Sequence, residues 1–258
     1  MAWTGSLSDL TCNDFLGGQV RLWQPVRGYR AGVDPVLLAA ACPAQKGEAV
    51  LELGCGAGAA MLCLAARTGA QVIGVEREPL YAGLARRNLA ENRAEGAVVE
   101  ADISALPPEV KARRFDHVIF NPPYFDRSKS SASPDAPREA AMGEETPLDT
   151  WLEVAAKRLR PGGSLTVIQR AERLDDLLAG FRGRLGSVTV LPIAPRQGRD
   201  ARLVIVAGLK GGGAALRLLA PLVLHEGARH ERDGEDYTLD TQAILRRGAA
   251  ICDGKVKF

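Results

Sequence analysis

The chain has 258 residues, a length that suits one large α/β domain or one domain with a modest appendage. Its formal net charge of +2 is nearly balanced, so charge neither requires nor excludes a nucleic-acid partner. The composition argues against a membrane-spanning, secreted or metal-binding protein: no apolar stretch approaches roughly 20 residues, the N-terminus lacks a signal pattern, and the cysteines and histidines show no metal-ligand spacing.

The first element expected in chain order is a helix at about residues 34–42. Asp34 is suited to the N-cap, and Pro35 to the first helical position, where the missing N–H of proline is tolerated. We expect residues 1–47 to form an N-terminal helical extension that packs on a domain comprising residues 48–258 with its C-terminal tail.

Strand and helix patterns alternate beyond this extension. Apolar runs predict strands at residues 50–53, 71–76, 97–102, 115–120, 164–169, 187–193 and 201–209, and helical spacing predicts helices at residues 59–68, 79–92, 148–159, 174–185 and 238–247. This alternation predicts right-handed crossovers, an α/β doubly wound and mainly parallel sheet of seven strands, and ligands at the carboxyl ends of the strands. Residues 126–147 fit a surface loop, either a substrate lid or merely a disordered insertion.

The tetrapeptide Asn121-Pro122-Pro123-Tyr124 directly follows the fourth predicted strand. Neither proline can donate to a sheet, and each restricts the residue before it, so the backbone must leave the sheet in a stiff, extended loop. The loop offers an amide side chain, unpaired carbonyls and an aromatic ring. These groups suit a flat molecule with an exocyclic amine, because carbonyls accept from the amine and the ring stacks on the plane. A proline-rich turn without a ligand is the simpler alternative.

Three further strand ends carry residues that suit a nucleoside ligand. The turn at residues 54–58 has glycines at alternate positions, which permit positive φ and let a ligand lie against bare backbone. Glu76 is placed to accept both hydroxyls of a ribose, and Asp102 to accept from an adenine amine with Ile103 against the ring. Taken singly, these are a tight turn, a solvated charge and a turn cap. Together with Asn121 they line one crevice of a parallel sheet.

This set resembles a class I S-adenosylmethionine-dependent methyltransferase. Residues 52–58, Glu-Leu-Gly-Cys-Gly-Ala-Gly, resemble the first motif of that family, Glu76 its ribose-binding acid and Asp102 its adenine-binding acid. Residues 121–124 resemble the signature of enzymes that methylate planar amino nitrogens, in adenine, cytosine, guanine or protein glutamine. The resemblance implies S-adenosylmethionine as the cofactor and a Rossmann-like sheet whose last strand is antiparallel.

A narrower resemblance concerns the two ends of the chain. Residues 15–18, 24–25 and 28–38 are similar to the N-terminal block of the bacterial valine-tRNA adenine-N6 methyltransferase group, and residues 237–245 to its C-terminal helix. This resemblance implies methylation of N6 of an adenine in tRNA or another structured RNA. A protein glutamine is an alternative acceptor, since its amide has the same planar amine. A cofactor-binding RNA-interaction module without turnover is a third possibility.

The resemblance implies a set of functional residues, and catalysis falls to Asn121, Pro122, Pro123 and Tyr124. Cofactor binding falls to Arg30, Glu52, Gly54, Cys55, Gly56, Gly58, Glu76, Arg77, Asp102, Ile103 and Asn121. The expected partner is RNA, with candidate phosphate contacts at Arg27, Arg30, Arg127, Lys129, Arg196, Arg199 and Arg202. We expect no metal and no Ser/His/Asp or Cys/His nucleophile, and the unpaired cysteines favour the cytoplasm.

Overall fold

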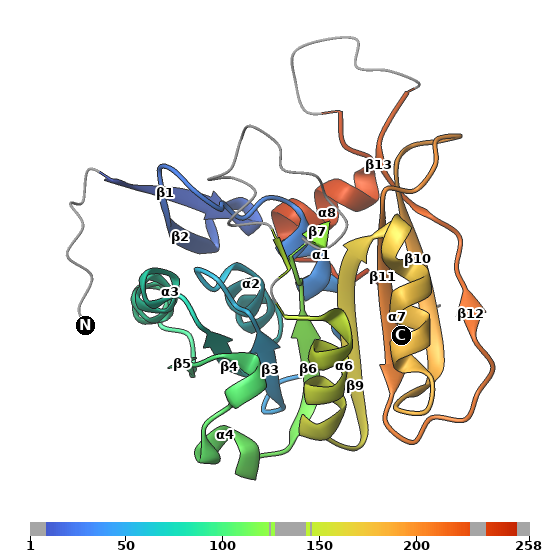
Figure 1. Ribbon diagram of the computed structural model, residues 1–258. Helices are drawn as coiled ribbons and strands as arrows, with labels where there is room; N and C mark the ends of the chain where they lie inside the picture. The colour runs from blue at the N-terminus through green and yellow to red at the C-terminus, as the bar shows by residue number, and fades with distance from the viewer. Residues whose placement is uncertain (1–8, 124, 127–142, 145, 228–235, 252–258) are drawn as a thin grey trace.

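The computed structural model describes residues 9–123, 125–126, 143–144, 146–227 and 236–251 (Figure 1). At its centre is a 9-stranded sheet in the order β12-β10-β11-β9-β6-β3-β4-β5, with β13 paired to β10. The strands are β3 (Ala49–Leu53), β4 (Gln71–Glu76), β5 (Gly96–Glu100), β6 (Phe115–Phe120), β9 (Leu159–Arg170), β10 (Gly186–Arg196), β11 (Leu203–Leu209), β12 (Arg217–Leu218) and β13 (Leu222–His225).

The directions of the strands confirm the predicted sheet. β3 pairs in parallel with β4 and β6, β4 with β5, and β6 with β9. β11, which corresponds to the last predicted strand, runs antiparallel to both β9 and β10. β12 and β13 add to the predicted sheet, because the apolar segment after β11 returns along the outer edge of β10 and pairs with it in parallel.

Helices cover both faces of the sheet (Figure 1). One face carries α1 (Asp34–Ala41), α2 (Ala59–Thr68), α3 (Pro79–Glu91) and α8 (Leu239–Arg247), and the other α4 (Pro108–Ala112), α6 (Leu148–Arg158) and α7 (Leu174–Phe181). Alternate residues of a strand point to opposite faces. In β3, Val50 therefore packs in one apolar cluster, while Leu51 and Leu53 pack in the other.

The N-terminal extension contains more than the predicted helix. It begins with an antiparallel hairpin of β1 (Leu10–Phe15) and β2 (Val20–Pro25), and α1 follows with Pro35 in its first turn. Val20 and Leu22 are buried in the same cluster as α1 and α2, so the extension packs on the sheet domain. The boundary between residues 47 and 48 stays a prediction.

Asn88 of α3 and Asn92, which caps the C-terminus of that helix, serve as the partners for the free edge of β2. Asn88 Oδ1 accepts from the Trp23 amide at 2.9 Å, and Asn88 Nδ2 donates to the Trp23 carbonyl at 3.0 Å. One helical turn later, Asn92 makes the same pair of bonds to the amide and carbonyl of Arg21, at 2.9 Å and 2.7 Å. Asn88 Nδ2 also donates to the Ala57 carbonyl at 2.9 Å. One fully buried side chain thus joins the hairpin to the glycine turn.

The expected loop at residues 126–147 lies mostly outside the described residues, so its role as a lid stays a prediction. Its described ends, β7 (Phe125–Asp126) and β8 (Gly143–Glu144), pair in parallel. None of the helices in the described ranges is long and apolar enough to cross a membrane. Across the same ranges, no group of three or more His, Cys, Asp or Glu side chains is placed to hold a metal ion.

Candidate cofactor and amine-binding site

The glycine turn after β3 needs its three glycines for their conformation, and it needs Gly54 for space as well. Gly54, Gly56 and Gly58 have φ values of 65°, 54° and 89°, a region that side chains rarely adopt. A Cβ on Gly54 would lie 2.6 Å from Cη2 of Trp151, which packs beneath the turn from α6. The Trp151 ring also meets Phe120 at the end of β6, with 5.5 Å between centroids. Trp151 therefore sets the height of the turn above the sheet.

Glu76 holds the turn from the neighbouring strand. Its Oε2 accepts from the amide of Gly56 at 2.8 Å, and its Oε1 accepts from the amide of Glu78 at 2.9 Å. Only 9% of the residue is exposed. Each carboxylate oxygen has a second lone pair, so both remain able to accept from a pair of hydroxyl groups. The carboxylate therefore positions the turn and presents acceptors at the same strand end.

Two other residues of the first motif are fixed by the protein itself. Glu52 is buried, and its Oε2 accepts from the Met61 amide at 2.8 Å in the first turn of α2. Burial raises the pKa of Glu52 well above its usual range. Cys55 is also buried, and its amide donates to the carbonyl of Val75 at 3.0 Å. Both residues shape the turn from below, and cofactor contact by either stays a prediction.

Asp102 follows β5 and caps a short 3-10 helix at Ile103–Ala105. Its Oδ1 accepts from the Ser104 amide at 2.8 Å and from the Ser104 hydroxyl at 2.6 Å. These hydrogen bonds, the hydroxyl first, hold the pKa of Asp102 below its usual range, so the group is a carboxylate at neutral pH. Ile103 beside it is buried in the apolar cluster under β4 and β6. The cap and the expected adenine contact are compatible, since a carboxylate has further acceptor sites.

The loop after β6 places a buried acceptor at the next strand end. Asn121 Oδ1 is buried and has no hydrogen-bond partner among the described residues. Gln169, almost fully buried in β9, donates from Nε2 to the carbonyl of Pro123 at 3.4 Å and so supports the loop. Buried amide oxygens nearly always have a donor, and the described residues leave this one able to accept from a ligand. Tyr124 lies outside the described residues.

The segment between β2 and α1 crosses the glycine turn. Tyr81 Oη donates to the carbonyl of Tyr29 at 3.1 Å, and the two rings meet edge-on with 6.4 Å between centroids. A Cβ built on Gly56 would lie 3.8 Å from Cε1 of Tyr29. Tyr29 thus stands over the turn as a wall of the crevice.

Two expected cofactor residues have other partners in the structure. The Arg30 guanidinium donates to Thr11 Oγ1 at 2.7 Å and to Asn13 Oδ1 at 2.8 Å, both on the hairpin. Arg77 lies 3.5 Å from Glu78 in an exposed ion pair. The assignment of Arg30 and Arg77 to the cofactor stays a prediction.

Four residues that build this site were not predicted from the sequence: Tyr29, Asn88, Trp151 and Gln169. A tryptophan on a helix face is typical of a core, and a glutamine at a strand end is typical of a surface. Asn88 could have been found from the sequence, because Asn92 follows it by four residues in a segment otherwise rich in Leu, Ala and Arg. Such polar pairs are neighbours on one helix face.

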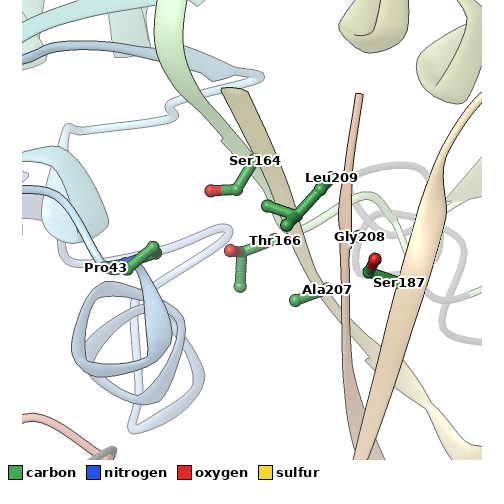
Figure 2. Close-up of a pocket in the computed structure, with 7 residues that line it drawn as sticks. All are labelled: Pro43, Ser164, Thr166, Ser187, Ala207, Gly208 and Leu209. Atoms are coloured by element: carbon green, nitrogen blue, oxygen red, sulfur yellow. The ribbon is translucent and has the colours of Figure 1, made fainter. Parts of the chain in front are cut away.

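A separate small hollow lies away from the crevice. Figure 2 shows it between Pro43 and the sheet, with Ser164, Thr166 and Ser187 in its wall. Ser164 pairs with His117 near the start of β6, and Ser187 is the second residue of β10, so the hollow lies toward the amino ends of these strands, away from Glu76 and Asn121. It therefore has no part in the site described above.

Alanine at Asp102 is expected to weaken binding of an adenine-containing cofactor by about 1–3 kcal/mol, because a buried amine would lose its acceptor. Alanine at Glu76 is expected to cost more, because the Gly56 amide loses its partner as well. Isothermal calorimetry measures both affinities. Ser104→Ala is the control, since it removes a hydrogen bond to Asp102 but leaves the carboxylate. Normal affinity in Asp102→Ala would exclude Asp102 from the site.

Comparison with known proteins agrees with this arrangement. A family model described as methyltransferase small domain matches residues 33–191. A tRNA1(Val) (adenine(37)-N6)-methyltransferase of Porphyromonas gingivalis is 36% identical over 179 residues, covering 63% of this chain and 69% of that protein. One of Bacteroides fragilis is 30% identical over 236 residues, covering 88% and 96%.

Solved structures show the same fold. The chain matches a structure titled as a predicted O-methyltransferase from Agrobacterium tumefaciens with a TM-score of 0.69 and 30% identity, covering 86% of this chain and 99% of that one. A 16S rRNA N2 methyltransferase of T. thermophilus, solved with AdoMet and guanosine, matches with a TM-score of 0.55 and 22% identity, covering 78% and 50%. With the family match across the strand ends that carry Glu76, Asp102 and Asn121, the chain belongs to the methyltransferase small domain family and is an S-adenosylmethionine-dependent methyltransferase.

Proposed function

We propose that this methyltransferase modifies N6 of an adenine in tRNA or another structured RNA, in the cytoplasm. The observation that carries the proposal is the buried Asn121 Oδ1, which has no partner within the described residues. An exocyclic amine supplies the missing donor, and its second N–H can bind another acceptor of the same loop. A hydroxyl that accepts a methyl group has a single O–H, and a carbon atom that accepts one has no polar hydrogen. The names of the relatives from P. gingivalis and B. fragilis support RNA as the carrier of that amine.

The residues of the crevice fit S-adenosylmethionine. The glycine turn at residues 54–58 gives bare backbone, Glu76 offers acceptors for the ribose hydroxyls, and Asp102 with Ile103 suits the adenine. When bound, the cofactor supplies a methyl group already activated on a sulfonium. We assign the expected set of cofactor residues to this crevice, with Glu52 and Cys55 acting by supporting the turn.

Catalysis by the chain consists of orienting and stabilising the amine. Asn121 Oδ1 and the Pro122 carbonyl accept the two N–H groups, which turns the nitrogen lone pair out of conjugation and toward the methyl group. As the nitrogen gains positive charge, both acceptors stabilise it. Gln169 keeps the loop in place through the Pro123 carbonyl. After transfer, the surplus proton leaves to water.

The proposal is tested with the purified protein, labelled S-adenosylmethionine and separate pools of tRNA, rRNA and DNA. We expect label in tRNA, recovered as N6-methyladenosine after digestion to nucleosides. Protein-bound label that survives nuclease treatment would replace the RNA proposal with a glutamine acceptor. Cofactor binding by calorimetry without label in any cellular fraction would mean a binding module without turnover.

Tyr124 is expected to stack on the target base. Tyr124→Ala should therefore raise the KM for RNA strongly, since stacking contributes roughly 1–3 kcal/mol per base. Tyr124→Phe keeps the ring and should remain close to wild type. Steady-state kinetics with tRNA compare the two variants. If phenylalanine is as damaging as alanine, the hydroxyl matters and stacking is the wrong role.

A further inference from the structure

The turn between β10 and β11 lies at the same edge of the sheet as Asn121. β9 is parallel to β6, and β11 runs antiparallel to both β9 and β10, so β10 ends where β6 ends. β11 is the second strand from β6, so its start lies roughly 10 Å from the end of β6 across the sheet and roughly 10 Å further along the strands, because Phe120 pairs with Val167 and Leu203 with Arg170. This turn is therefore within a few nucleotides of a base held at Asn121.

Hydrogen bonds connect the turn to the catalytic loop through one short piece of chain. Gln169 donates to the carbonyl of Pro123, and two residues later the amide of Ala171 donates to the carbonyl of Arg202 at 3.0 Å. Gly198 takes a φ of 71° within the turn, and the Arg199 amide donates to the Arg196 carbonyl at 3.2 Å, which closes it. The turn is thus fixed relative to the loop.

The turn carries two exposed arginines that are not committed to a partner. Across the described residues, the guanidinium groups of Arg199 and Arg202 make no hydrogen bond and no ion pair, and both residues are exposed. Nearby arginines differ, since Arg173 pairs with an acid 2.7 Å away. Arg196 pairs with Asp236 across the base of the turn. Positive charge is therefore available at Arg199 and Arg202, which outnumber the one exposed acid between them, Asp200.

We propose that Arg199 and Arg202 form a phosphate-binding surface for the RNA nucleotides next to the target base. This inference rests on the proposed function, because it takes RNA as the substrate. The planar guanidinium forks match phosphate oxygens and need no base sequence. The surface fixes the register of the strand, and Asn121 then receives the base at a set distance from it.

The test compares two double variants with the same loss of charge. Arg199→Ala with Arg202→Ala removes the proposed surface, whereas Arg113→Ala with Arg114→Ala removes two exposed arginines from the opposite edge, before β6. RNA affinity is measured by fluorescence titration of labelled tRNA over a series of salt concentrations, and KM and kcat by methyl transfer. Melting temperature and cofactor affinity show that each variant is folded.

We expect the turn variant to raise the KM for tRNA about tenfold with kcat unchanged. For the same variant, the slope of log affinity against log salt concentration should become shallower by about 1.4, because two phosphate contacts to a single strand are lost. Arg199→Lys with Arg202→Lys should restore most of the salt slope, because the charges return. An unchanged slope and KM would overturn the assignment, and so would an equal loss in the Arg113 and Arg114 variant. If wild-type protein labels no RNA, the proposed function fails instead, independently of either variant.

Discussion

Replacing Asn121 with alanine is expected to lower turnover by about 100-fold, the usual loss when one charge-stabilising group leaves a preorganised site. The alanine variant keeps both prolines and the Gln169 support, so the loop and the fold should persist. What disappears is the acceptor Oδ1, which has no other partner among the described residues. Single-turnover rates at saturating tRNA and cofactor measure the chemical step directly.

Asn121→Asp is the matched control, because it keeps an acceptor oxygen at almost the same position. It should retain more activity than Asn121→Ala, since a carboxylate also stabilises the positive charge that develops on the amine. Cofactor affinity, measured by calorimetry, should fall far less than turnover in both variants, because most of the cofactor contacts assigned to the crevice remain. If alanine lowers cofactor affinity as much as it lowers turnover, Asn121 is a cofactor-binding residue and its role toward the amine is refuted.

Replacing Asn88 with alanine is expected to lower the free energy of unfolding by roughly 2–5 kcal/mol, because buried backbone groups lose their partners. Three such groups are involved: the amide and carbonyl of Trp23 and the carbonyl of Ala57. The loss should also weaken cofactor binding, since the last of these lies in the glycine turn. Urea denaturation and calorimetry measure the two effects.

Asn92→Ala supplies the comparison, because Asn92 makes the same pair of bonds to β2 at a more exposed position. Water can replace the lost bonds there, so the expected cost is about 1 kcal/mol, and cofactor affinity should not change. If both variants lose the same free energy of unfolding, burial does not explain the contribution of Asn88 to stability. A normal cofactor affinity in Asn88→Ala would separate the hairpin from the glycine turn.

Most of the fold follows from local patterns. The strands at β3, β4 and β6 are apolar runs that end in a glycine turn, an acid and a proline pair, and the prediction of their common edge depends only on parallel pairing. The hairpin was not predicted, because the outer edge of β2 is paired by asparagine side chains at the C-terminal end of α3 rather than by a strand. Such a partner cannot be predicted from hydrophobic periodicity, because polar side chains of a distant helix do not alter the apolar pattern of the strand.

The candidate site was predicted to the extent that its residues stand at strand ends. Glu76 and Asn121 needed only the strand boundaries, which apolar runs mark well. Trp151 could not be found in this way, since its contact with Gly54 depends on how α6 packs against β6. Cofactor contact by Glu52 stays a prediction, and the bond from its carboxylate to the first turn of α2 could not be predicted because it joins two elements.

The asparagine contacts of α3 have a consequence for how this protein can change over evolution. Asn88 and Asn92 bind backbone atoms of β2, and every residue except proline presents the same amide and carbonyl. The solvent-facing Arg21 can therefore be replaced by other residues during evolution, whereas the asparagines that bind the backbone of β2 must be kept. Related chains should keep an amide side chain at position 88 while the hairpin sequence diverges, and proline should be absent at positions 21 and 23. A designer could accordingly replace Arg21 without removing the asparagine bonds to β2, whereas the Trp23 side chain itself binds Glu91 and Arg87 of α3 and would have to stay.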